Sequence, residues 1–193
     1  MKLKKVFDLC KKSDVCRLVD QTPGNRNTAQ WMGDNFSLYL INDMPYLEER
    51  NIYSMFDVSE KKRNDFYFEH MIDGAPCCLD DTHQSERPIE RLYVQIVHKN
   101  ELLTPMKTSR GITLVPNKYL RPFDDQREAI ECYERDGGRI IAVKIGMYLA
   151  AVIVGIAVDK DFLDQLEELL EESRYTLERN CINFDRETGE VRP

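Results

Sequence analysis

Four side chains of the types that bind zinc lie close together in the sequence. They are His70, Cys77, Cys78 and His83, which fall within 14 residues. Zinc is held by thiolates and imidazoles whose spacing lets a loop wrap around the ion. Two adjacent cysteines rarely bind the same zinc ion, and the chain contains no C-x-x-C pair. We therefore expect ordinary loop thiols here, and a metal-dependent enzyme is the third of three functional hypotheses.

The other catalytic patterns are incomplete. A restriction-type nuclease centre needs a strand that carries Glu-x-Lys, because carboxylates bind Mg²⁺ and the lysine assists the attack. Lys144 lies at the end of such an apolar run, but Ala142 occupies the position of the glutamate. The chain also lacks the G-x-S-x-G nucleophile motif and the glycine-rich phosphate-binding motifs. These observations predict a protein that is not an enzyme and that uses no cofactor.

A row of carboxylates near the end of the chain is the strongest binding pattern. Between Asp159 and Glu172 there are seven acidic residues and one basic residue, Lys160. Such a row presents a phosphate-like field to a basic groove, or it is simply the solvated face of a helix. A net charge of −7 is modest for a complete mimic of DNA. The predicted partner-binding residues are Asp164, Glu167, Glu168, Glu171 and Glu172.

The composition limits the classes of protein that remain. The chain has 193 residues, of which 42% are hydrophobic and 32% are charged, as in a folded globular protein. The negative net charge argues against a nucleic-acid binder that works through a broad basic surface. Six cysteines without a secretory signal predict reduced thiols and a cytoplasmic location in a bacterial host. We expect a protein partner, and direct binding of nucleic acid is not favoured.

The periodicity of the apolar residues predicts the helices and strands that position the candidate binding residues. The pattern predicts an α+β fold with a mainly antiparallel sheet in two loosely similar halves. We expect an N-terminal helix, a middle helix and a long C-terminal helix, at 3–12, 47–58 and 160–179. The expected strands are 15–19, 29–32, 36–41, 65–70, 91–98, 102–106, 111–115 and 129–134. A loop at 71–88 predicts two subdomains, 1–75 and 89–182.

The most apolar stretch of the chain runs from 140 to 158 and carries one charge, Lys144. Its length is sufficient for a helix that crosses a membrane. Its isoleucines and valines favour strands instead, and a charge inside a membrane span is costly. Residues 144–147 can turn the chain between two strands. We therefore expect a buried hairpin and no membrane contact.

Four stretches of the sequence resemble a family of small proteins from phages and mobile elements of gut Firmicutes. They are MKLKKVFDLC at 1–10, QWMGD at 30–34, KTSRGI at 107–112 and AVKIGMYLAAVI at 142–153. The resemblance extends from residue 1 to about residue 180 and rests on structural motifs. It implies a relationship to anti-CRISPR proteins that act on type II RNA-guided nucleases, without marking any contact residue.

Two non-enzymatic hypotheses follow. The first is a phage-type protein that binds a host defence nuclease and inhibits it by covering the DNA-facing surface. The second is a DNA-replication accessory protein similar to a sliding clamp, for which the lysines of the first predicted helix would face the DNA. The partner, the contact surface and the oligomeric state stay open at this point.

Overall fold

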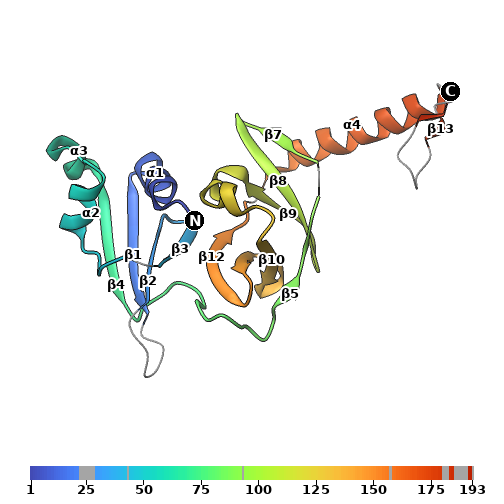
Figure 1. Ribbon diagram of the computed structural model, residues 1–193. Helices are drawn as coiled ribbons and strands as arrows, with labels where there is room; N and C mark the ends of the chain where they lie inside the picture. Colours follow the sequence, from blue (N-terminus) through green and yellow to red (C-terminus); the bar gives the residue numbers. More distant parts are fainter. Residues whose placement is uncertain are drawn as a thin grey trace. The chain divides into compact units, whose positions relative to one another are not determined.

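The computed structural model contains an eight-stranded sheet, built from strands between residues 15 and 154 (Figure 1). The structure describes residues 1–21, 29–42, 44–92, 94–156, 158–179, 183–184 and 191–192. The strand order is β4 (Tyr67–Ile72), β1 (Val15–Gln21), β2 (Ala29–Gly33), β3 (Ser37–Ile41), β12 (Tyr148–Val154), β11 (Ile140–Ile145), β10 (Ile130–Arg135) and β5 (Arg87–Pro88). All neighbours are antiparallel except β1 and β4. The predicted α+β class with a mainly antiparallel sheet is confirmed.

Helix α1 (Leu3–Ser13) covers part of this sheet with its predicted apolar stripe. Val6, Phe7 and Cys10 are fully buried, because their spacing places them on one side of the helix. The Phe7 ring stacks on Phe56 with ring centroids 4.1 Å apart. Tyr119 belongs to a short 3₁₀ helix (Asn117–Tyr119) and packs in the same core. A second 3₁₀ helix (Arg121–Gln126) follows it.

The middle helix is shorter than predicted and is followed by another helix. Helix α2 (Glu49–Met55) lies inside the predicted range 47–58, and its first turn is closed by a capping box between Glu48 and Asn51. Helix α3 (Glu60–Asp65) was not predicted, because all its side chains are exposed and it has no apolar face. The strand expected at 65–70 therefore begins later, at Tyr67.

A second sheet has four strands, which lie between β5 and β10 in the sequence. Strand β8 (Glu101–Thr108) pairs with β6 (Glu90–Arg91), β7 (Ile96–His98) and β9 (Gly111–Pro116). The prediction of one core strand over 91–98 is wrong. The segment is divided between β6 and β7, and Val94 and Val97 are 62% and 69% exposed. Tyr93, between these strands, lies outside the described residues.

The apolar run at 140–158 forms the predicted hairpin. Strands β11 and β12 pair from Ile140–Val154 to Ile145–Tyr148, and Gly146 adopts the positive φ of 61° that a tight turn requires. Ile141, Val143 and Ile153 are fully buried. Within the described residues, no helix combines the length and the apolar character that a membrane span needs.

The chain divides into two compact units, Met1–Ile156 and Ala157–Pro193. This division differs from the predicted subdomains 1–75 and 89–182. Strand β3 of the first predicted subdomain pairs with β12 of the second, and Leu38 lies opposite Val152. Local sequence patterns carry no information on which strands pair when they lie more than 100 residues apart, so the single sheet was not predictable from them.

The second unit consists of helix α4 (Lys160–Arg179) followed by two short strands, β13 (Asn183–Phe184) and β14 (Val191–Arg192). The helix has the bounds that the sequence predicted. Asp159 begins it by accepting a hydrogen bond from the Phe162 backbone N–H at 3.0 Å, as an N-cap residue does. A helix of 20 residues is about 30 Å long.

Candidate functional site

Helix α4 carries all five predicted partner-binding residues. Their side chains are exposed and form no hydrogen bond or ion pair with any described residue. At 100° per residue, they fall within one broad arc of the helix surface. The structure therefore brings together the predicted residues Asp164, Glu167, Glu168, Glu171 and Glu172.

The apolar stripe of α4 is uncovered to a large extent. Leu163, Leu169 and Leu170 are 49%, 60% and 62% exposed, whereas Phe162 and Leu166 are half-buried. Apolar and acidic side chains meet in a shallow groove along the helix, which is lined by Leu163, Leu166, Glu167, Leu170, Glu171 and Arg174. An isolated helix of this length is only marginally stable in water, because most helical stability comes from packing of the apolar face. Exposed leucines in a row are typical of a surface that another molecule covers.

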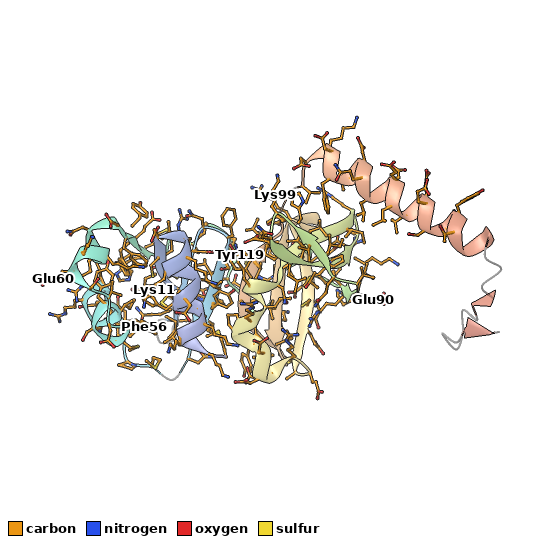
Figure 2. The ribbon with its side chains drawn as sticks, turned by 90° about the horizontal axis from the view of Figure 1, so that it is seen from above. Lys11, Phe56, Glu60, Glu90, Lys99 and Tyr119 are labelled. Atoms are coloured by element: carbon orange, nitrogen blue, oxygen red, sulfur yellow. The ribbon has the colours of Figure 1, made fainter. Side chains whose placement is uncertain are left out.

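The basic face of α1 is engaged in part within unit 1. Lys5 forms an ion pair with Asp124 at 2.5 Å, and Lys2 pairs with Asp125 at 2.7 Å. Lys11 donates a hydrogen bond to the Phe56 carbonyl at 3.2 Å (Figure 2). The same lysine lies 5.0 Å from the centre of the Phe7 ring. These contacts reduce the positive charge that the helix offers to DNA, on which the sliding-clamp hypothesis depends.

The zinc ligands considered from the sequence are separated in the structure. His70 Nε2 lies 3.0 Å from Asp20 Oδ2, Cys78 donates to Asp80 at 3.4 Å, and His83 contacts Ser85 at 2.8 Å. No group of three or more metal-binding side chains gathers anywhere in the described part of the chain.

His70 belongs to a buried polar cluster around Asp20. This aspartate is 4% exposed and accepts hydrogen bonds from Gln30 Nε2, at 2.9 Å, and from the Tyr46 hydroxyl. Burial acts to raise the pKa of Asp20, but the hydrogen bonds from Tyr46, Gln30 and His70 outweigh it and hold the pKa below the usual value. Gln30 also accepts a hydrogen bond from the Leu47 backbone N–H at 2.7 Å. The cluster therefore anchors the segment that leads into α2.

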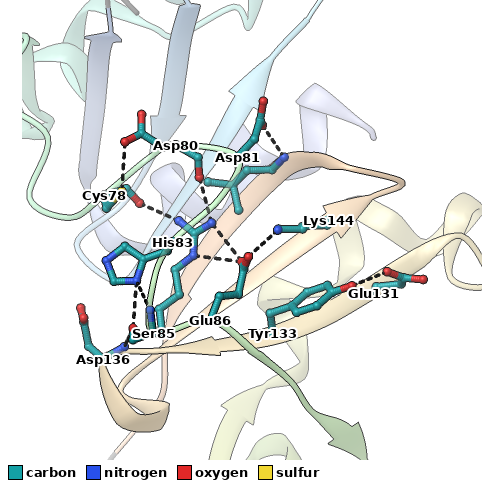
Figure 3. Close-up of polar contacts among 12 residues, drawn as sticks. Cys78, Asp80, Asp81, His83, Ser85, Glu86, Glu131, Tyr133, Asp136 and Lys144 are labelled. Atoms are coloured by element: carbon teal, nitrogen blue, oxygen red, sulfur yellow. Dashed lines mark hydrogen bonds and ion pairs between the residues drawn. The ribbon is translucent and has the colours of Figure 1, made fainter.

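A second buried cluster fastens the long loop before β5 to the sheet (Figure 3). Arg135, at the end of β10, donates hydrogen bonds to the carbonyls of Cys78 and Asp80 at 3.0 and 2.8 Å. It also contacts Glu86 at 3.1 Å, and Lys144 of β11 binds the other oxygen of this carboxylate at 2.6 Å. The side chains of Arg135, Glu86 and Lys144 are only 2%, 11% and 8% exposed. Since every one of these charges is paired, the cluster is structural and supplies no free base or nucleophile.

The loop is fastened at two further points. Asp81 accepts a hydrogen bond from the Leu149 backbone N–H at 2.8 Å, and the Ser85 hydroxyl accepts one from the Asp136 backbone N–H at 3.2 Å (Figure 3). Sequence reasoning missed the role of Glu86 and Arg135, which lie 49 residues apart. Proline, glycine and aspartate in 71–88 predicted a loop, but no local pattern indicates which distant strand binds it.

Searches against protein-family models, curated proteins and solved structures find no match to this chain.

Proposed function

We propose that this chain is a non-enzymatic, phage-type protein that binds a nucleic-acid-handling nuclease of the host and inhibits it. Helix α4 is the contact element, and the inhibited surface is the one that faces DNA. The observation that carries this proposal is the state of α4: its predicted acidic residues are exposed and unpaired among the described residues, beside exposed leucines.

The chemistry of α4 defines the partner surface. A nuclease binds the phosphates of DNA through lysines and arginines, so its groove is positively charged. Carboxylates along one side of a helix complement such a groove, and they increase the rate of association through electrostatic steering. The leucines would then fill an apolar depression in the partner, as an amphipathic helix does in a groove. Burial of this stripe supplies affinity, and the carboxylates supply specificity.

The test is a pull-down of the tagged full chain from a host lysate that contains a type II RNA-guided nuclease, followed by a DNA-cleavage assay. We expect recovery of the nuclease and loss of cleavage. The variant Glu168→Lys, Glu171→Lys, Glu172→Lys should lose inhibition while its thermal stability stays nearly unchanged. The matched control reverses three exposed acidic residues of unit 1: Asp8→Lys, Glu60→Lys, Asp65→Lys.

Equal inhibition by the α4 variant and the control variant would refute the role of α4. Recovery of a polymerase or a clamp loader, with DNA cleavage unaffected, would favour the replication-accessory alternative over nuclease inhibition.

A further inference from the structure

A cleft of about 670 Å³ lies in unit 1 where the chain passes from the eight-stranded sheet to the four-stranded sheet. Its apolar lining comes from Ile89 in the connecting segment and from Ile130 and Cys132 on β10. Strand β6 supplies Arg91 and strand β8 supplies Thr104. The volume is in the range of pockets that hold small organic molecules.

Two polar side chains in this cleft lack a partner. The Thr104 hydroxyl is buried, with 4% of the residue exposed, and has no hydrogen bond within the described residues. The half-buried Arg91 guanidinium likewise forms no hydrogen bond or ion pair with any residue that the structure describes. A buried hydroxyl without a partner is destabilising, so such groups are rare in folded proteins.

The sheet register places these two groups on the same face. Arg91 pairs with Met106 across the β6–β8 ladder, and Thr104 is two residues from Met106 along β8. Side chains two residues apart in a strand point to the same face, and diagonal neighbours lie about 7–8 Å apart. One small acidic group can therefore contact both the guanidinium and the hydroxyl.

The charges around the cleft restrict the ligand. Glu90, Glu128 and Glu131 are exposed at its edge, and the second arginine, Arg127, is paired with Asp124 at 2.7 Å. The positive charge of Arg91 acts inside the cleft: burial raises the pKa of Cys132 to about 11, and Arg91 opposes this rise. The three exposed carboxylates at the edge oppose a multiply charged phosphate or nucleotide more strongly than an anion with a single charge, which the Arg91 guanidinium inside the cleft can pair.

We propose that this cleft is a binding site for a small monocarboxylate with an apolar body. The carboxylate accepts hydrogen bonds from the Arg91 guanidinium and the Thr104 hydroxyl, and the apolar body packs on Ile89, Ile130 and Cys132. A planar guanidinium matches a carboxylate with two parallel hydrogen bonds. The site is independent of α4 and of the proposed nuclease inhibition.

Isothermal titration of the full chain with hexanoate, hexanamide and hexyl phosphate tests the site. Hexanoate should bind at least about tenfold more tightly than the neutral amide or the phosphate, since 1.4 kcal/mol corresponds to a factor of 10. Arg91→Gln and Thr104→Val should each weaken hexanoate binding by about tenfold or more. The control Arg127→Gln, on the same cleft, should leave it within about twofold.

Each other result counts against the site. Equal affinity for hexanoate and hexanamide, or full hexanoate binding by Arg91→Gln, would show an apolar cleft without a carboxylate position. No binding of hexanoate at millimolar concentration would overturn the proposal. Thr104→Val keeps the shape of the side chain and removes an unpaired hydroxyl, so this variant should fold at least as stably as the parent chain. If Arg91→Gln unfolds, Thr104→Val still tests the site.

Discussion

Acidic residues are buried and paired in the interior of unit 1, whereas on the surface of α4 they are exposed. In unit 1, Glu86 is buried between Arg135 and Lys144, and each charge has a partner. On α4, Glu168 and its acidic neighbours are exposed and have none among the described residues. A buried charge must be paired to be tolerated, whereas an exposed charge is free to meet another molecule.

The leucines follow the same division. Leu18 and Leu103 in the sheets of unit 1 are fully buried, whereas Leu169 and Leu170 on α4 are more than half exposed. The core leucines of unit 1 are therefore covered by their own sheets, whereas these two leucines of α4 are exposed. Under the proposed function, stability resides in unit 1 and binding in α4, so substitutions in the two parts should have separate consequences.

The largest expected effect is at Arg135. Arg135→Met should lower the free energy of unfolding by about 3–5 kcal/mol, because it leaves the buried Glu86 carboxylate and the carbonyls of Cys78 and Asp80 without their common donor. Urea denaturation measures this loss. The three charge reversals on α4 should change the same quantity by no more than about 0.5 kcal/mol. A loss below 1 kcal/mol for Arg135→Met would contradict the structural role of the cluster.

A pair of leucine truncations sharpens the comparison. Leu18→Ala should cost about 2–5 kcal/mol, because it opens a cavity in the core of the sheet. Leu170→Ala removes the same atoms from a side chain that is 62% exposed, and it should change stability by about 0.5 kcal/mol or less. Thermal melting compares both variants, and partner binding should fall only for Leu170→Ala. Equal destabilisation by the two truncations would mean that α4 is covered within the folded chain.

The Asp20 cluster should give the protein a specific acid sensitivity. The pKa of Asp20 is lowered in the folded chain, so its contribution to stability is present above the unfolded value of about 3.9 and is lost as the pH falls through the lower folded value. Asp20→Asn should therefore lower the free energy of unfolding at pH 7. It should also reduce the difference between the free energies of unfolding at pH 7 and pH 3. Denaturation curves at the two pH values measure this change, and an unaltered difference would exclude Asp20 as a source of the acid sensitivity.

The smallest effect is expected at the surface of α1. Lys2 and Asp125 form an ion pair in which both side chains are more than half exposed. Lys2→Gln should change the free energy of unfolding by less than about 1 kcal/mol, and 0.5 M NaCl should remove most of that change. A larger effect that persists in salt would assign this pair to the structural group with Arg135.

The elements with strong periodicity were predictable from the sequence. The apolar stripe of α4 indicated its bounds, and the isoleucines and valines on both sides of a turn at 144–147 indicated the hairpin of β11 and β12. Two features were not predictable from the sequence: the parallel pairing of β4 with β1, and the division of 91–98 into two short strands. Both depend on which distant strand supplies the partner. The predicted acidic residues of α4 were found together because a helix fixes their spacing. Arg91 and Thr104 were missed, since they meet only through the register of β6 and β8.

The pairing of β3 with β12 also has a consequence for synthesis of the chain. Strand β3 is complete at Ile41, but its partner on one side is made of residues Tyr148–Val154. While the ribosome is making the intervening segment, this side of β3 has exposed backbone groups and apolar side chains, which is a state prone to aggregation. The middle of the sheet therefore closes late, after most of unit 1 has been translated. We therefore expect nascent chains that stall before β12 to aggregate more readily than the full chain.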